Sequence, residues 1–192
     1  MSETRPPSIQ RLSRDAYYMG IAIAVRERAS CLGTRVGAVL VLDDRVISTG
    51  YNGTPMNMKN CDEGGCERCA NRERSYPSGE AYDFCICVHA EQNALLTAAR
   101  FGIPVQGTTL YTTKQPCFGC TKELIQAGIQ RVYYLHDWKP KAGQERQYEL
   151  LQNRIPEGIR QLALVDPRVE WAEGGRTLMP RDSDPASDEA EP

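Results

Sequence analysis

Four residues have side chains whose types and spacing could do chemistry together. His89 and Glu91 stand one residue apart at the start of the run HAEQNALL, and Cys117 and Cys120 stand in the stretch PCFGC. Both pairs open segments whose apolar spacing predicts a helix. In a first helical turn the helix dipole favours a thiolate. Two thiolates and one imidazole suit a zinc ion and leave its fourth tetrahedral position open.

Glu91 needs a different role from these three ligands. Residues at i and i+2 lie on different faces of a helix, so Glu91 need not bind the same ion. A zinc ion lowers the pKa of its bound water to roughly 7, and a carboxylate beside that water can take a proton and return it. The pattern H-x-E followed by P-C-x-x-C is a signature of zinc nucleobase deaminases. A zinc ion that only joins two helices is the structural alternative, and it leaves Glu91 unexplained.

The elements that must position these residues follow from the surrounding patterns. A helix over 13–30 with Ser13 as its cap precedes a hairpin over 36–53, which turns at Asp43 and Asp44. Helices and strands then alternate, which implies parallel strands with helices on both faces of the sheet. The fold class is therefore expected to be α/β, a three-layer α/β/α arrangement around a central mixed sheet of about five strands. The alternating segments are helices at 89–102, 117–128 and 143–154, strands at 108–113 and 129–135, and weaker strand candidates at 159–165 and 168–172.

Composition predicts one folded domain with loose ends. The 192 residues are 41% hydrophobic, and we expect a domain over 13–172, with a flexible N-terminus at 1–12 and a disordered acidic tail at 173–192. The last twelve residues hold one positive and five negative side chains, while the whole chain carries a net charge of −2. That balance offers no strong electrostatic field for nucleic acid, so no nucleic-acid partner is expected. No apolar run predicts a membrane span, and the N-terminus lacks a secretory pattern, so a cytoplasmic location is expected.

The cysteines outside the first motif predict a second metal. Residues 56–88 have no periodicity and are too long for a bare loop, so metal cross-linking is the simplest way to order this cysteine-rich insert. Four of the six remaining cysteines could bind a structural zinc ion. The first choice is Cys31, Cys61 and Cys66 with either Cys85 or Cys87, and some or all could instead be free buried thiols. The full set of candidates is Cys31, Cys61, Cys66, Cys69, Cys85 and Cys87.

Longer segments resemble a known family. CLGTRVGAVLV, STGYNGTP, NCDEGGCERC, CICVHAEQNALL and PCFGCTKELIQAGIQRVYY are similar to segments of deoxycytidylate (dCMP) deaminases, including the bacterial late-competence type, within the zinc-dependent cytidine/deoxycytidylate deaminase family. The resemblance implies hydrolysis of dCMP to dUMP and ammonia, which supplies the thymidylate precursor. It implies that Glu91 protonates N3 of cytosine, that Asn52 hydrogen-bonds the deoxyribose, and that the backbone around Ala90 holds the base edge.

The resemblance also implies further partners and cofactors. Members of the family are typically homo-oligomers, and many are switched on by dCTP and off by dTTP, which bind with Mg²⁺ away from the zinc ion. Several bacterial and phage relatives hold a second zinc ion. The sequence assigns no residues to an effector site.

Other interpretations remain open at this stage. Asn52 could simply form a turn, because Asn-Gly tolerates the left-handed conformation. Arg35, Lys59 and Lys114 are candidate phosphate contacts, although most surface cations are only solvated charges. His136 is expected to be a surface or rim histidine. The rival functions are deamination of CMP, guanine, free cytosine or tRNA adenosine, a riboflavin-pathway deaminase, and a zinc-stabilised nucleotide-binding module without turnover.

Overall fold

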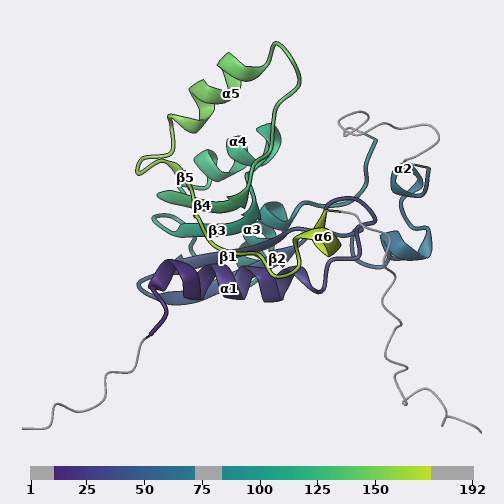
Figure 1. The fold of residues 1–192 in the computed structure, drawn as a ribbon, viewed down its shortest axis with the longest axis horizontal. Helices are drawn as coiled ribbons and strands as arrows, with labels where there is room; N and C mark the ends of the chain where they lie inside the picture. The colour runs from purple at the N-terminus through teal and green to yellow at the C-terminus, as the bar shows by residue number, and fades with distance from the viewer. Residues whose placement is uncertain (1–10, 72–83, 174–192) are drawn as a thin grey trace, which may run out of the picture.

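A mixed five-stranded sheet forms the centre of the molecule (Figure 1). The computed structural model describes residues 11–71 and 84–173. The strand order is β2-β1-β3-β4-β5, in which β1 runs antiparallel to β2 and β3, and β3, β4 and β5 run parallel. The predicted fold class is therefore confirmed.

A tight hairpin supplies the antiparallel edge of the sheet. Strand β1 spans Gly37–Leu42 and β2 spans Arg45–Tyr51. The turn between them places Asp43 at φ 47° and Asp44 at φ 58°. Two consecutive positive φ values are those of a type I′ turn, whose twist matches that of the flanking strands. The expected acidic turn is thus present.

Helical crossovers connect the parallel strands. Helix α3 (Ala90–Arg100) precedes β3 (Thr109–Lys114), and α4 (Phe118–Gln126) joins β3 to β4 (Arg131–His136). Helix α5 (Glu145–Gln152) then leads to the short strand β5 (Ile159–Gln161). Helix α3 ends before Gly102 and α4 ends before Gly128, both at positive φ, as the sequence predicted.

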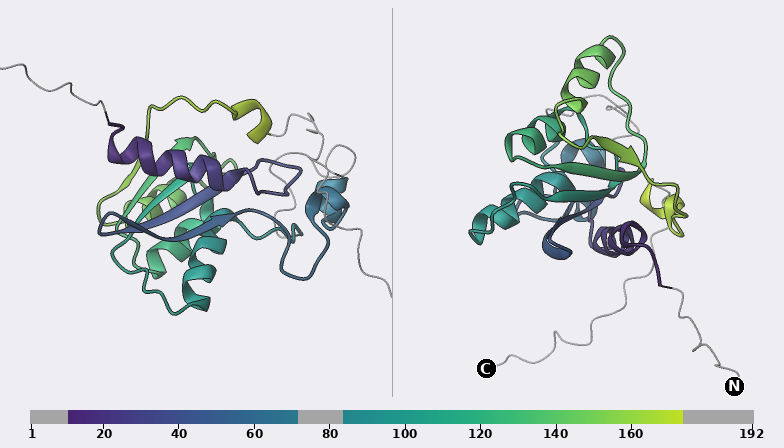
Figure 2. Two further views of the ribbon diagram at one scale, coloured as in Figure 1. Left: turned by 90° about the horizontal axis from the view of Figure 1, so that it is seen from below. Right: turned by 90° about the vertical axis from the view of Figure 1, so that its left-hand side faces the viewer.

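Helices cover both faces of the sheet, which gives the three layers (Figure 2). Helix α1 (Arg14–Arg26) is capped by Ser13 and packs on one face with Val39 and Val41. Helices α3 and α4 pack on the other face with Ala38 and Leu40. The alternation along β1 follows from the two-residue period of a strand. Helix α1 ends at Arg26, four residues before the predicted end.

Gly50 in β2 sets how closely α3 approaches the sheet. A Cβ atom at this position would lie 2.2 Å from the Ala90 carbonyl oxygen and 2.3 Å from the Ala94 nitrogen. Only glycine leaves room for that backbone contact. Ser48 Oγ, on the same strand, donates a hydrogen bond of 2.7 Å to the Ala94 carbonyl. The start of α3 is therefore held firmly against β2.

The cysteine-rich insert forms its own small core beside the sheet. Its described part holds a 3₁₀ turn, η1 (Cys61–Glu63), and a one-turn helix, α2 (Glu67–Ala70). The buried residues of this small core are all cysteines, and the half-buried Cys85 packs against them. They are Cys31, Cys61, Cys66, Cys69 and Cys87.

One expectation for the C-terminal segment needs correction, and one residue has an unexpected partner. Residues 168–172, a weak strand candidate, form the short helix α6 (Val169–Ala172). His136 is half-buried, which agrees with a rim position, and its Nε2 lies 2.6 Å from Asp166 Oδ2, a partner that the sequence did not reveal. Asp166 also accepts two hydrogen bonds from Arg26, at 2.7 and 2.8 Å, and both side chains of that ion pair are almost fully buried. A buried guanidinium needs such a partner, so the chain after β5 returns to α1.

The expected loose ends fall mainly outside the described residues, as do residues 72–83 of the insert. Within the described ranges, the helices are too short and too polar to span a bilayer.

Candidate active site and metal centres

Two helix starts at one edge of the sheet carry the predicted ligands. His89 is the N-cap residue of α3, and Cys117 is the N-cap residue of α4, three residues after the end of β3. Cys120 lies in the first turn of α4. Open α/β sheets place their sites at the carboxyl ends of strands, where helices begin. The two motifs, 28 residues apart in sequence, meet there.

The three ligand atoms have the spacing that a zinc ion requires. His89 Nδ1 lies 3.4 Å from Cys117 Sγ and 3.4 Å from Cys120 Sγ. All three ligand atoms lie within 4.8 Å of one another. Zinc bonds of roughly 2.0–2.3 Å at tetrahedral angles separate nitrogen and sulfur by about 3.6 Å. The donor set and its distances therefore fit one zinc ion.

Neighbouring groups favour a thiolate at Cys117 and a protonated ring at His89, and that ring must lose its proton to bind zinc. The hydrogen bond from Cys120, helped by His89, lowers the pKa of Cys117 to about 4. The same thiolate raises the pKa of His89 to about 9, although burial opposes this. The Cys120 pKa is raised by Cys117 and by burial. A zinc ion would replace the protons that these three side chains share, because metal ligands bind in their deprotonated forms.

Glu91 lies beside this ligand set with its carboxylate buried. The residue is 4% exposed, and its Oε2 lies 3.6 Å from Cys120 Sγ. Burial raises the pKa of Glu91 to about 7, while the nearby His89 acts in the opposite direction. A carboxyl group that titrates near neutrality can both take and give a proton at that pH. The position suits a proton carrier next to an open coordination position.

A network of hydrogen bonds fixes the two helix starts relative to each other. Gln92 Oε1 accepts from the His89 backbone N–H at 2.9 Å, and Gln92 Nε2 donates to Glu123 Oε1 at 2.9 Å across to α4. Asn93 Nδ2 donates to the Tyr51 carbonyl at 2.7 Å, which ties α3 to the end of β2. These partners limit the movement of His89 and Cys120, as metal ligands require.

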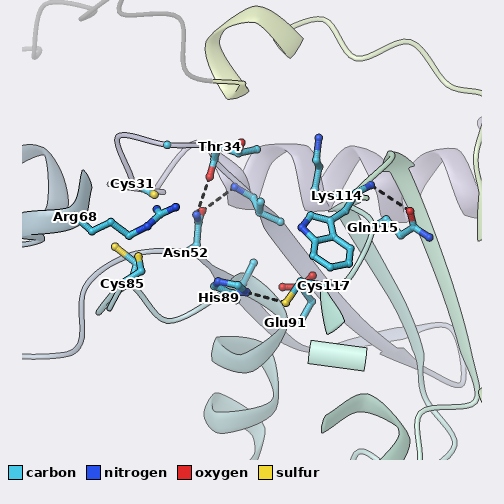
Figure 3. A pocket seen from close by; sticks show the side chains of 15 residues that line it. Cys31, Thr34, Asn52, Arg68, Cys85, His89, Glu91, Lys114, Gln115 and Cys117 are labelled. Carbon is cyan, nitrogen blue, oxygen red and sulfur yellow. Dashed lines mark hydrogen bonds between the residues drawn. The ribbon is translucent and has the colours of Figure 1, made fainter. Parts of the chain in front are cut away.

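The ligands open into a pocket that reaches the cysteine-rich insert (Figure 3). Its walls include the predicted residues Asn52, Ala90 and Glu91. They also include Gln115 and Trp138, which the sequence analysis did not single out. The Trp138 backbone N–H donates to Gln115 Oε1 at 3.1 Å, so the two are joined. Neither belongs to a recognisable motif, so no sequence signal marked them.

Asn52 is not a left-handed turn residue. It is 7% exposed and is absent from the described positions with positive φ. Its Oδ1 accepts from the Val36 N–H at 2.7 Å, and its Nδ2 donates to the Thr34 carbonyl at 2.8 Å. The amide thus holds the loop before β1 in place and keeps one N–H and one lone pair for a ligand.

Two cationic side chains line the pocket. Lys114 lies there and pairs with Glu173 at 3.1 Å, and its side chain is 22% exposed. Arg68, which the sequence analysis passed over, is buried on the opposite wall. Arg35 instead donates to the Trp171 carbonyl and stacks over its ring at 4.6 Å. Lys59 is exposed and is not among the pocket residues.

The six other cysteines form two overlapping groups. In each group, all four sulfur atoms lie within 4.8 Å of one another. Neither group is the set expected first: the first group has Cys69 in place of Cys66, and the second group has Cys69 but lacks Cys31 and Cys61. Cys69 lies on the one-turn helix α2, and its position could not be read from spacing alone. The groups are Cys31, Cys61, Cys69 and Cys87, and Cys66, Cys69, Cys85 and Cys87.

Comparisons with known proteins agree with this geometry. Residues 12–136 match the family described as the cytidine and deoxycytidylate deaminase zinc-binding region. The chain is 38% identical to the deoxycytidylate deaminase of Saccharomyces cerevisiae over 168 residues, which are 87% of this chain and 51% of that protein. It is 41% identical to the deoxycytidylate deaminase of Mycobacterium phage D29 over 127 residues, which are 62% of this chain and 92% of the phage protein.

A solved structure has the same fold. The apo dCMP deaminase of cyanophage S-TIM5 superimposes with a TM-score of 0.57 at 26% identity, covering 77% of this chain and 96% of that chain. The chain spans about half the length of the yeast relative. The family match covers most of the sheet, both helix starts and all eight cysteines. The chain is therefore a member of the cytidine and deoxycytidylate deaminase family.

Proposed function

We propose that this protein hydrolyses dCMP to dUMP and ammonia. The observation that carries the proposal is the placement of the buried Glu91 carboxylate 3.6 Å from Cys120 Sγ, beside three ligand atoms with zinc spacing. A structural zinc site has no need of such a carboxylate. The similarity to proteins named deoxycytidylate deaminase supports the choice of substrate.

The roles of the chain's residues follow from their positions. His89, Cys117 and Cys120 would hold the zinc ion, which supplies a Lewis acid and acidifies a water molecule. Glu91 accepts a proton at its buried carboxylate, delivers it to N3 of the cytosine ring, and assists the departure of ammonia. Burial raises its pKa to about 7, so the carboxylate is suited to both transfers.

The rest of the pocket suits a deoxyribonucleotide. Asn52 has hydrogen-bonding capacity left for the deoxyribose, and the backbone at Ala90 borders the pocket where the base edge would lie. Lys114 and Arg68 bring positive charge to the walls, as recognition of a monophosphate requires. Of the pocket cations, Lys114 is the more accessible and is the one proposed to contact the phosphate.

Several further properties are proposed with the function. The cysteine core is proposed to hold structural zinc. From the family resemblance, a homo-oligomer in the cytoplasm is proposed, with dCTP and dTTP as effectors that bind together with Mg²⁺. Turnover measured against dCMP concentration, with and without each effector and Mg²⁺, tests the last point. If neither effector changed the dependence of turnover on dCMP concentration, regulation by dCTP and dTTP would be excluded.

The substrate is tested by measuring ammonia release from dCMP, CMP, deoxycytidine, guanine and a tRNA. We expect dCMP to have the highest kcat/KM. Faster release from tRNA or guanine would overturn the substrate. No release from any of them would support a nucleotide-binding module without turnover. The Cys117→Ser variant should lose the catalytic zinc ion and all activity, and metal analysis reports the first loss independently of the second.

A further inference from the structure

All cysteines of the chain belong to one of two places. The sequence contains eight, of which Cys117 and Cys120 belong to the site with His89. The other six lie together in one small core, which combines the five cysteines of the insert with Cys31. The only other histidine, His136, is hydrogen-bonded to Asp166 elsewhere. The insert core is thus an all-sulfur environment with six potential ligands.

The six sulfur atoms are more than one zinc ion can bind. A tetrahedral ion takes four ligands, which would leave two thiols of the core without metal. The two groups of four share Cys69 and Cys87, and no single group contains all six cysteines. Two tetrahedra that share an edge have six corners, two of them common to both. The sulfur pattern is therefore that of two metal ions bridged by two thiolates.

The distances agree with this pattern. Cys66 Sγ lies 3.9 Å from Cys85 Sγ, and these are the two unshared members of the second group. Zinc–sulfur bonds of roughly 2.3 Å at tetrahedral angles separate two sulfur atoms by about 3.8 Å. A disulfide would instead require about 2.05 Å. The spacing therefore fits ligands of one ion and not a cross-link.

Bound cations would have to offset the cost of burying thiolates here, because five of the six cysteines are buried. One backbone group also helps: Cys61 Sγ accepts a hydrogen bond from the Leu32 N–H at 3.4 Å. Two divalent ions with six thiolates leave two negative charges in excess. The buried Arg68 lies one residue before Cys69 and lines the same wall as Cys31 and Cys85 (Figure 3). A cation at this place offsets part of that charge.

We propose that the six cysteines hold a binuclear zinc cluster, with Cys69 and Cys87 as bridging ligands. Cys31 and Cys61 would complete one ion, and Cys66 and Cys85 would complete the other. The proposal deepens the structural zinc proposed above but is independent of deamination. Cys87 stands two residues before His89, and the intervening Val88 pairs with Gly53. The cluster would therefore fix the chain that leads into α3 and form one wall of the pocket.

Zinc content of the purified full chain gives the first test. We expect about three zinc ions per chain in the unmodified protein and about two in Cys117→Ser, which lacks only the catalytic ion. If the unmodified protein held about two zinc ions and Cys117→Ser held about one, the binuclear cluster would be overturned in favour of a single structural ion. The difference between the two proteins reports the catalytic ion, so failure of the catalytic proposal is seen separately from failure of this one.

A matched pair of variants tests the ligand assignment. Cys61→Ser and Cys66→Ser each remove an unshared ligand, one from each ion. Each variant should lose about one zinc ion or more relative to the unmodified chain. A single ion held by the first group predicts no loss in Cys66→Ser, and one held by the second group predicts no loss in Cys61→Ser. Either result would overturn the proposal.

X-ray absorption at the zinc edge avoids the risk that these variants fail to fold. In Cys117→Ser, all remaining zinc should have sulfur neighbours, with a second zinc ion at roughly 2.6–3.5 Å, the range expected when two tetrahedra share an edge of two sulfur atoms. Sulfur coordination without a zinc–zinc vector would overturn the bridged cluster.

Discussion

Glu91 Oε2 lies 3.6 Å from Cys120 Sγ, although the two residues belong to different helices. Glu91 is only 4% exposed, at the base of the pocket between the starts of α3 and α4. This burial explains why the pKa of Glu91 rises to about 7. The packing that brings His89, Cys117 and Cys120 together therefore also buries the carboxylate that we propose as the proton carrier.

Replacement of Glu91 by Gln should slow turnover strongly without removing the metal. The amide has the same shape but cannot carry the proton, and such groups contribute roughly 10²–10⁴-fold to rates. We expect kcat for dCMP to fall by about that factor, with zinc content unchanged by metal analysis. Glu145→Gln, the same change at an exposed position in the first turn of α5, should leave both unchanged. A near-normal rate in Glu91→Gln would show that Glu91 does not carry the proton.

Lys114→Met should weaken binding of the phosphate specifically. Loss of a charge-assisted contact costs roughly 1.5–3 kcal/mol, so kcat/KM for dCMP should fall about tenfold or more. Deoxycytidine has no phosphate, and its kcat/KM should be nearly unaffected. Lys141→Met removes an exposed lysine outside the pocket and is the control. Equal losses on both substrates would show that Lys114 acts on the fold or on the base instead.

Asp166→Asn should destabilise the fold through the buried Arg26. The variant leaves a guanidinium without its charged partner, which costs roughly 3–5 kcal/mol in such sites. Urea unfolding would measure the loss. Glu157→Gln, which breaks a half-exposed pair with Arg131, should cost about 1 kcal/mol or less. Similar losses in the two variants would show that burial of the Arg26 pair does not matter.

The same pair predicts how acid affects stability. Burial alone would raise the pKa of Asp166, but the hydrogen bonds from Arg26 and His136 outweigh it and hold the pKa well below its usual value. A carboxyl group with a lower pKa in the folded state stabilises the protein fully above its unfolded pKa of about 4. This contribution is lost as the pH falls below that value. The difference in stability between the native chain and Asp166→Asn should therefore narrow between about pH 4 and pH 2.

Gly50→Ala should destabilise the protein because α3 lies too close for a methyl group. The added Cβ would meet backbone atoms at 2.2 and 2.3 Å, and relief requires helix and strand to move apart, at roughly 1–3 kcal/mol. Gly20→Ala is the matched control. It lies on the exposed face of α1 with no atom within 4 Å, so it should stabilise the helix by about 0.5–1 kcal/mol. Thermal unfolding would show whether Gly50→Ala lowers the melting temperature while Gly20→Ala raises it.

The sequence by itself determined the elements that carry the chemistry. Helix starts at His89 and Cys117 are marked by local spacing, and their stops are marked by Gly102 and Gly128, so both could be located without coordinates. The alternation of helices and strands determined the parallel half of the sheet, and the Asp43–Asp44 turn determined the hairpin. These features depend on residues that are near one another in the chain, where backbone preferences act directly.

Only the tertiary structure decided which distant residues meet. Arg26 and Asp166 are 140 residues apart and carry no common pattern, so neither their ion pair nor the partner of His136 could be foreseen. Residues 168–172 have the apolar content of a strand but form one helical turn, because strand-like composition in a short segment is overridden by packing. The position of Cys69 in both groups of sulfur atoms likewise depends on how the folded chain places α2 beside Cys31. Spacing limits which sulfur atoms can reach a common point, but the folded backbone alone sets which ones do.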